Sequence, residues 1–132
     1  MRRFVVALLI LGLTAPLVHG QAPDVLIGQY RCDGVGADGA AYRATVDIAA
    51  HGDAYTLTWH FQPDGAAIGV GVRHKDALAV IYQLDTGEIG LVAYLIEQAS
   101  SGQLRLVGRW TVPGAPSMGT EVLVQITRRA AR

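Results

Sequence analysis

Hydrophobic and polar residues alternate along most of the chain with a period of two. The alternation is clearest in residues 42–48 and 55–61, and groups of turn-forming residues such as His51-Gly52-Asp53 and Pro63-Asp64-Gly65 separate the runs. A period of two is typical of half-buried strands, and Asp, Gly and Pro favour turns. The pattern predicts no helix and strands near residues 26–33, 41–49, 54–61, 66–73, 77–84, 88–97, 103–112 and 120–128.

The connections between these predicted strands are short. Parallel neighbours need long crossovers, so each strand should pair antiparallel with the next. An eight-stranded meander around one core either closes or leaves two exposed edges, and closure removes the edges. The sequence therefore predicts an all-β fold, an antiparallel eight-stranded up-and-down meander barrel. A two-sheet β-sandwich is the alternative.

The first twenty residues have the pattern of an export signal. Arg2 and Arg3 precede an apolar run from Phe4 to Leu13, and Val18-His19-Gly20 provides a site for cleavage before Gln21. A membrane anchor is the alternative, but a span needs about 20 apolar residues and this run is shorter. We expect residues 1–20 to be a signal peptide and residues 21–132 to form a single β-barrel domain. The location should be periplasmic or extracellular, with no integral membrane segment after signal cleavage.

Charge and cysteine content narrow the classes of partner. The chain has 11 basic and 11 acidic residues and a formal net charge of zero, which argues against nucleic-acid binding. Hydrophobic residues make up 51% of the sequence, enough for one core. Cys32 is the single cysteine, so no disulfide forms within the chain. We expect a buried Cys32; pairing between two chains is the alternative.

Aromatic residues gather on one parity of the predicted strands, the parity assigned to the barrel interior. Eight-stranded barrels have interiors that side chains fill or that hold one small ligand. The first functional hypothesis is therefore a non-catalytic binding or structural accessory protein with a small apolar or aromatic ligand inside. A packed core is the alternative. The predicted ligand-binding residues are Tyr30, Trp59, Tyr82 and Trp110. The other aromatics of this parity are Tyr42, Tyr55 and Phe61.

The runs at 77–84, 88–97 and 120–128 are apolar on both parities, so the sequence leaves their inward side undecided. An outer apolar patch would indicate a protein-interaction or adhesion module, or a homo-oligomer. Scattered apolar surface residues are the alternative. The predicted interaction face consists of Ile81, Val92, Tyr94 and Ile96, and the same outer parity includes Ala79, Leu123 and, between them, Val107.

Residues 34–39 match Gly-x-Gly-x-x-Gly, but a strand follows where dinucleotide folds have a helix. A glycine-rich lid at one barrel mouth is the interpretation that we retain. The histidines His51, His60 and His74 are too widely separated to indicate a metal, and no Gly-x-Ser-x-Gly motif occurs. We expect no enzyme, no metal and no cofactor.

Four carboxylates lie at positions from which they could converge, and the sequence cannot place them relative to one another. They are Asp47, Glu88, Glu97 and Glu121. Arg109 and Glu121 lie at the ends of the two last predicted strands, and we expect a structural contact between them that closes the barrel. Contact of this pair with a ligand is the alternative.

Six short motifs carry a resemblance to known proteins. They are Gly28-Gln29-Tyr30, Tyr55-Thr56-Leu57-Thr58-Trp59, Gly69-Val70-Gly71, Leu78-Ala79-Val80, Gly108-Arg109-Trp110-Thr111 and Gly119-Thr120-Glu121. Through them residues 28–124 resemble a group of small exported bacterial β-proteins, some labelled fibronectin-binding protein, and the resemblance implies adhesion to a host matrix protein. The strand count and the opening Gly-x-aromatic are also loosely similar to avidin and lipocalin barrels, of which the avidin shape is the closer analogy.

Overall fold

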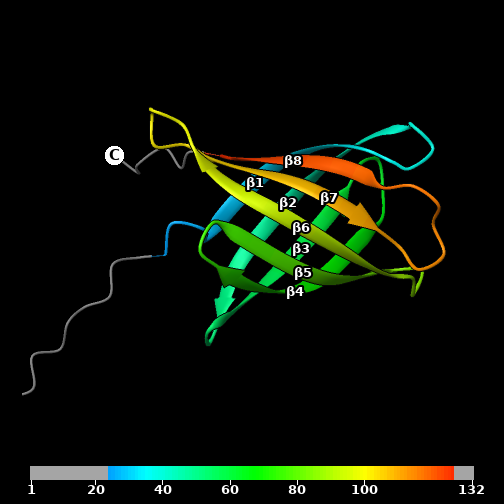
Figure 1. Cartoon of the computed structure of the whole chain (residues 1–132), viewed down its shortest axis with the longest axis horizontal. Coiled ribbons are helices and arrows are strands. Elements are labelled where there is room, and N and C mark those ends of the chain that lie inside the picture. Colours follow the sequence, from blue (N-terminus) through cyan, green and yellow to red (C-terminus); the bar gives the residue numbers. More distant parts are fainter. Residues whose placement is uncertain (1–23, 127–132) are drawn as a thin grey trace, which may run out of the picture.

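Residues 24–126 are described by a computed structural model, and they form a closed barrel of antiparallel strands (Figure 1). The strands follow one another around the barrel in chain order, and the last strand pairs with the first. They are β1 (Gly28–Val35), β2 (Ala41–His51), β3 (Ala54–Phe61), β4 (Ala66–His74), β5 (Ala77–Leu84), β6 (Ile89–Gln98), β7 (Leu104–Thr111) and β8 (Gly119–Gln125). The predicted meander barrel is confirmed, and the sandwich alternative is wrong.

Closure of the barrel depends on six residue pairs between β1 and β8, from Tyr30 opposite Gln125 to Val35 opposite Thr120. All backbone edges of the sheet are thereby paired, which removes the sites at which another chain could extend the sheet. The described residues contain no helix of the length and hydrophobicity that a membrane span requires.

One end of the barrel is closed by the segment that precedes β1. Leu26 is fully buried in the core, and its backbone carbonyl accepts a 2.8 Å hydrogen bond from the Tyr30 hydroxyl. Asp24 accepts hydrogen bonds from the Leu26 amide, at 3.0 Å, and from the Tyr55 hydroxyl. This segment fills the end of the barrel at which β1 begins and β8 ends.

The opposite end of the barrel is formed by the β1–β2, β3–β4, β5–β6 and β7–β8 connections, which lie together on the right of Figure 1. The core beneath it is apolar on the inward parity of every strand, and its one buried charged residue among those described is Glu121.

The bounds of the first and last strands differ from the prediction. β1 begins and ends two residues later than expected, at Gly28 and Val35. Asp33-Gly34 had the composition of a turn, but it lies within the strand because Gly34 faces the ring of Tyr42. β8 spans Gly119–Gln125. The predicted signal peptide of residues 1–20 and the chain after residue 126 lie outside the described residues.

The predicted outward orientation is wrong for two strands. Val92 and Tyr94 of β6 are 0% and 2% exposed, and Ile96 packs against the core. Leu123 of β8 is also buried. The inward parity of β6 begins at Gly90, so Ile89, Leu91 and Leu95 face outward instead. Ile81 and Ala79 of β5 do face outward, as expected.

Candidate functional site: a cavity inside the barrel

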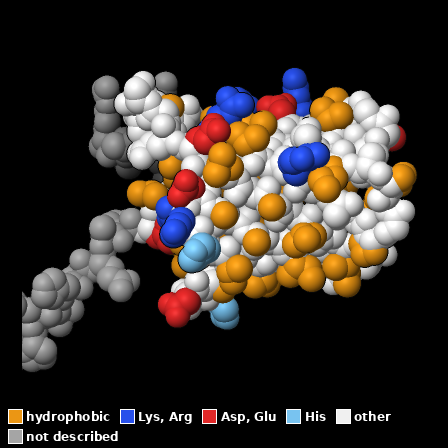
Figure 2. All heavy atoms as spheres, viewed as in Figure 1, with side chains coloured by type: hydrophobic (Ala, Val, Ile, Leu, Met, Phe, Trp, Pro, Cys, Tyr) orange, Lys and Arg blue, Asp and Glu red, His pale blue; other side chains and the backbone are white. Residues whose placement is uncertain are grey.

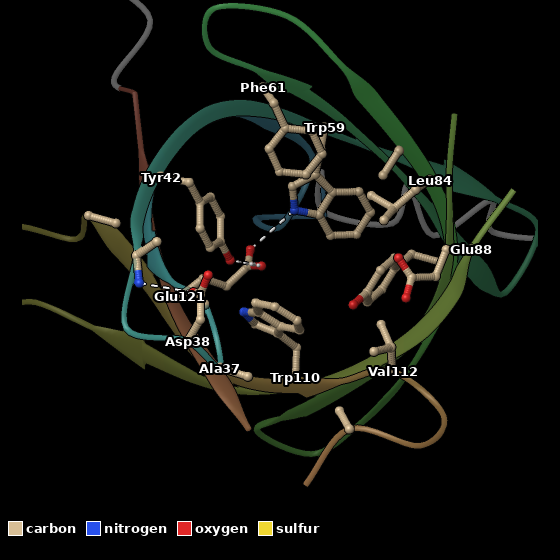
Figure 3. A pocket seen from close by; sticks show the side chains of 16 residues that line it. Ala37, Asp38, Tyr42, Trp59, Phe61, Leu84, Glu88, Trp110, Val112 and Glu121 are labelled. Carbon is tan, nitrogen blue, oxygen red and sulfur yellow. Dashed lines mark hydrogen bonds between the residues drawn. The ribbon is translucent and has the colours of Figure 1, made fainter. Parts of the chain in front are cut away.

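A cavity of about 480 Å³ lies inside the barrel at the end that the β1–β2 connection covers (Figure 3). Its wall is mainly aromatic, and in Figure 3 the rings of Tyr42, Trp59, Phe61 and Trp110 surround a central space. The described residues that line it are Gly36, Ala37, Asp38, Ala40, Ala41, Tyr42, Trp59, Phe61, Ala67, Tyr82, Leu84, Glu88, Trp110, Val112, Ala115 and Glu121. The volume is within the range of sites for small molecules.

Glycines on neighbouring strands set the positions of the aromatic rings. Tyr82 pairs with Gly90 across the sheet, and Trp110 pairs with Gly119. A Cβ atom at Gly90 would lie 2.2 Å from the Tyr82 ring, and one at Gly119 would lie 2.1 Å from the Trp110 ring. A missing side chain thus makes room for each ring to lie flat against the neighbouring strand. The rings line the cavity rather than fill it.

The floor of the cavity is a buried carboxylate with four donors. Glu121 Oε2 accepts hydrogen bonds from Tyr94 Oη at 2.8 Å, from Trp59 Nε1 at 3.1 Å and from Cys32 Sγ at 3.4 Å. Its Oε1 accepts one from Tyr42 Oη at 3.1 Å, and the Trp59 and Tyr42 bonds are drawn in Figure 3. An ionised carboxylate accepts and never donates, so this donor set fits the anion. Glu121 therefore joins five strands, β1, β2, β3, β6 and β8, around one charge.

The groups that donate to Glu121 remain protonated at neutral pH. Burial, followed by the charge of Glu121, raises the pKa of Tyr94 well above its usual value. The same two causes, in the same order, raise the pKa of Tyr42 and of the Cys32 thiol. A thiol that is buried and protonated is a poor nucleophile. The cluster is accordingly a structural and electrostatic element, with no activated nucleophile at Cys32.

One polar atom of the lining has no partner among the described residues. The indole nitrogen of Trp110 is buried without a hydrogen-bond acceptor. A buried donor without a partner costs about 1–3 kcal/mol. An acceptor on a bound molecule would satisfy this donor.

Two connections form the mouth of the cavity. The β1–β2 connection contributes Gly36, Ala37, Asp38 and Ala40 to the lining, and it is held by bonds from the Gly36 amide to the Ala40 carbonyl at 2.8 Å and from the Gly39 amide to the Gly36 carbonyl at 2.9 Å. The hydroxyl of Ser117, in the β7–β8 connection, donates to the Ala37 carbonyl at 3.2 Å. The glycine-rich segment thus lies at a barrel mouth, where a lid was expected; its movement stays a prediction.

Three of the four predicted ligand-binding residues line the cavity, namely Trp59, Tyr82 and Trp110. Tyr30 does not, because its hydroxyl is turned toward Leu26 at the closed end. The aromatic parity is correct, since Tyr42, Tyr55 and Phe61 also face the interior. Cys32 is fully buried inside the barrel, as expected, and its position does not fit pairing with a second chain.

The predicted contact between Arg109 and Glu121 is wrong. Arg109 pairs with Thr120 across the sheet, whereas Glu121 pairs with Gly108, so the two side chains point to opposite faces. The sequence assigned two residues of this cluster to other places, Glu121 to a contact with Arg109 and Tyr94 to the outer face. A glycine could have indicated the orientation of Tyr94, because Gly108 lies opposite Tyr94 and leaves room for the Tyr94 ring on the inner face.

Within residues 24–126, no three His, Cys, Asp or Glu side chains come together as a metal-binding group. Of the four carboxylates that could have converged, Glu88 and Glu121 line the cavity. Asp47 lies 3.6 Å from His60 and Glu97 forms an exposed ion pair with Arg105, both outside the barrel.

The fold and site define a small closed β-barrel with an internal cavity. No family model and no curated protein matches the sequence, so the resemblance to exported bacterial β-proteins stays a prediction. Among solved structures the chain is similar to a redesigned beta barrel, with 13% identity and a TM-score of 0.59 over 77% of this chain and 92% of that one. It is also similar to a redesigned beta barrel, mFAP1, bound to DFHBI, with 11% identity and a TM-score of 0.53 over 76% and 94%. At these identities the similarity shows the fold alone.

Proposed function

We propose that this chain is a non-catalytic binding protein that holds a small molecule in its barrel cavity. The observation that carries the proposal is the space of about 480 Å³ between aromatic rings and a buried carboxylate. A barrel that served only as a packed structural element would fill this volume with side chains.

The position of the polar groups supports the same function. The Trp110 indole nitrogen is an unused donor, while Asp38 and Glu88 offer acceptors in the lining. A few convergent polar groups in an otherwise apolar wall are typical of small-molecule sites. A redesigned beta barrel of similar fold, mFAP1, has been solved bound to DFHBI, and this similarity supports the proposal.

The proposal places the protein outside the cytoplasm, periplasmic or extracellular. Its support is the sequence of the first twenty residues, with two arginines before an apolar run.

Binding can be measured with the protein's own tryptophans. The sequence contains two, Trp59 and Trp110, and both line the cavity. A panel of neutral, cationic and anionic aromatic compounds should therefore include members that change the tryptophan emission and saturate with one molecule per chain. If no compound does so, and the protein purified from its host carries no added mass, the proposed function fails.

A matched pair of variants separates cavity binding from binding elsewhere. Ala67 of β4 is 2% exposed and lines the cavity, so Ala67→Leu places three further carbons in the empty space. Ala79 of β5 is exposed on the outer face, so Ala79→Leu adds the same atoms outside the barrel. Ligands should lose at least tenfold in affinity with Ala67→Leu and keep it with Ala79→Leu. Equal affinity in both variants would place the ligand outside the cavity.

The outer face of β4, β5 and β6 favours a second candidate, association with another copy of the chain. Val70, Ile81 and Leu91 pair across these strands in one row, and each is more than half exposed. Further exposed apolar residues on the same three strands are Ile68, Val72, Ile89 and Leu95. Figure 2 shows hydrophobic side chains gathered over this region, with charged ones mainly elsewhere in the view. A contiguous apolar face of this kind marks interaction surfaces.

The test is the mass of the particle in solution, by sedimentation, for the wild type and for Ile81→Lys. A self-associating face predicts an oligomer that Ile81→Lys converts to monomer, while Arg105→Glu on β7, outside this face, leaves the oligomer intact. A wild-type monomer at all concentrations would refute self-association.

A further inference from the structure

The charge of the cavity lining is negative, and no positive side chain balances it. Three carboxylates, Asp38, Glu88 and Glu121, line the cavity, and none of the described lining residues is Lys, Arg or His. The ion pairs found among residues 24–126 involve Asp33, Asp47 and Glu97 and include none of these three carboxylates.

Glu121 is held without a counter-cation. Its four donors are two phenols, an indole and a thiol, all of which are neutral. Hydrogen bonds stabilise the carboxylate but do not cancel its unit charge. Because the surroundings are apolar, the field of that charge extends into the cavity with less screening than in water.

The rings add a second feature that suits a positive charge. The centroids of Trp59 and Tyr82 are 5.8 Å apart, and those of Tyr42 and Trp110 are 6.2 Å apart, so that two pairs of rings border the same space. The faces of Trp and Tyr rings carry negative electrostatic potential and attract cations within about 6 Å of the ring centroid. An enclosure of several aromatic rings is the arrangement that recognises ammonium groups.

Tyr82 reports the same field. Burial, then the charges of Glu121 and Glu88, raise the pKa of its hydroxyl to about 12. The part of this shift that comes from the two carboxylates disfavours a further negative charge beside the Tyr82 hydroxyl.

We propose that the ligand of the cavity is an organic cation, an ammonium or similar nitrogen cation on an apolar or aromatic body, with its charged group inside the space that the aromatic rings and the carboxylates of Glu88 and Glu121 border. The inference rests on the proposed function, since it concerns the ligand of the same cavity. It adds the sign of the ligand's charge, which the proposed function leaves open.

The experiment compares two compounds of nearly equal shape, benzyltrimethylammonium and its neutral carbon analogue neopentylbenzene, with benzenesulfonate as the anion. Affinities are measured from the emission of Trp59 and Trp110. The cation should bind at least tenfold more tightly than the neutral analogue, and the anion should bind more weakly than either.

A charge variant at the rim tests the contribution of the lining without disturbing the buried cluster. Glu88 is exposed to solvent and follows the β5–β6 turn, so Glu88→Gln should leave the fold intact. This variant should lower the affinity for benzyltrimethylammonium at least threefold and leave the affinity for neopentylbenzene unchanged. Glu97→Gln removes a charge from the outer face and is the matched control, with no effect on either compound.

The outcomes separate this inference from the proposed function. Equal affinity for the cation and its neutral analogue, or a preference for the anion, overturns the charge inference and leaves the cavity as a ligand site. Failure of all three compounds, together with failure of the wider panel, overturns both.

Discussion

Replacing Glu121 by Leu should destabilise the barrel, because four donors from other strands converge on this carboxylate. Trp59 Nε1 and Tyr94 Oη are buried and would be left without an acceptor. Each buried donor without a partner costs about 1–3 kcal/mol, which gives about 2–6 kcal/mol for the two. Removal of a desolvated charge offsets part of this loss. We expect the free energy of unfolding to fall by about 2–4 kcal/mol.

Glu121→Gln should lower the free energy of unfolding by less, about 1 kcal/mol. Its amide oxygen still accepts hydrogen bonds from Trp59 and Tyr94, but these bonds no longer involve a charged acceptor. The assay is urea unfolding followed by far-UV circular dichroism. In a domain of this size, each 1 kcal/mol corresponds to about 4–8 °C in Tm. Glu97→Leu, which removes an exposed carboxylate, is the control and should stay within about 0.5 kcal/mol of the wild type.

A double-mutant cycle attributes the effect to the hydrogen bonds. Glu121→Leu and Tyr94→Phe should show a coupling energy of about 0.5–3 kcal/mol, because each substitution removes the 2.8 Å bond that the two groups share. If Glu121→Leu is as stable as the wild type, or if the cycle shows no coupling, the hydrogen bonds of this carboxylate do not stabilise the barrel interior as described.

Four further predictions address pH, packing and processing. The five tyrosines of the sequence all have a pKa above the usual 10, so little phenolate absorbance should develop in the folded protein at pH 10; a full phenolate signal there would contradict the burial described. The folded state holds these protons and that of Cys32 more tightly than the unfolded state does, so the free energy of unfolding is highest below about pH 9. It falls as the pH rises through 9–12, by about 1.4 kcal/mol per pH unit for each group that titrates only after unfolding. Cys32→Ala should reduce this slope between pH 9 and 10, which urea unfolding midpoints would show. Gly119→Ala should lower the free energy of unfolding by about 1–3 kcal/mol and alter the emission of Trp110, since its Cβ meets that ring at 2.1 Å; an unchanged spectrum would argue against the described packing. The intact mass of the protein from its host should lack residues 1–20, whereas retention of Met1 to Gly20 would exclude the signal peptide.

The sequence predicted the barrel from its turn residues and from strands, such as β2 and β3, that have one polar face. In β2 and β3 the alternation assigns every side chain to the core or the solvent, and the structure agrees. In β6 both faces are apolar, since Leu91 and Leu95 face outward while Val92 and Tyr94 face inward. Hydrophobicity alone cannot orient such a strand, and a shift of one residue reverses all of its side chains.

The same ambiguity concealed the centre of the site. The sequence predicts a contact between Glu121 and Arg109, because the two residues lie at adjacent strand ends across the connection of residues 113–118. The donors around Glu121 explain its inward position. These donors, such as Cys32 and Tyr94, come from strands that are far apart in the sequence. Glycines opposite aromatic residues, as at Gly90 and Tyr82, are a local pattern that orients a strand when hydrophobicity does not.

The most direct test of the central claim is native mass spectrometry of the wild-type protein and of Ala67→Leu, both purified gently from the native host. We expect one added small-molecule mass per wild-type chain, absent from Ala67→Leu, in which the cavity is partly filled. A wild-type protein without added mass, or an added mass that Ala67→Leu retains in full, would contradict a ligand held inside the barrel.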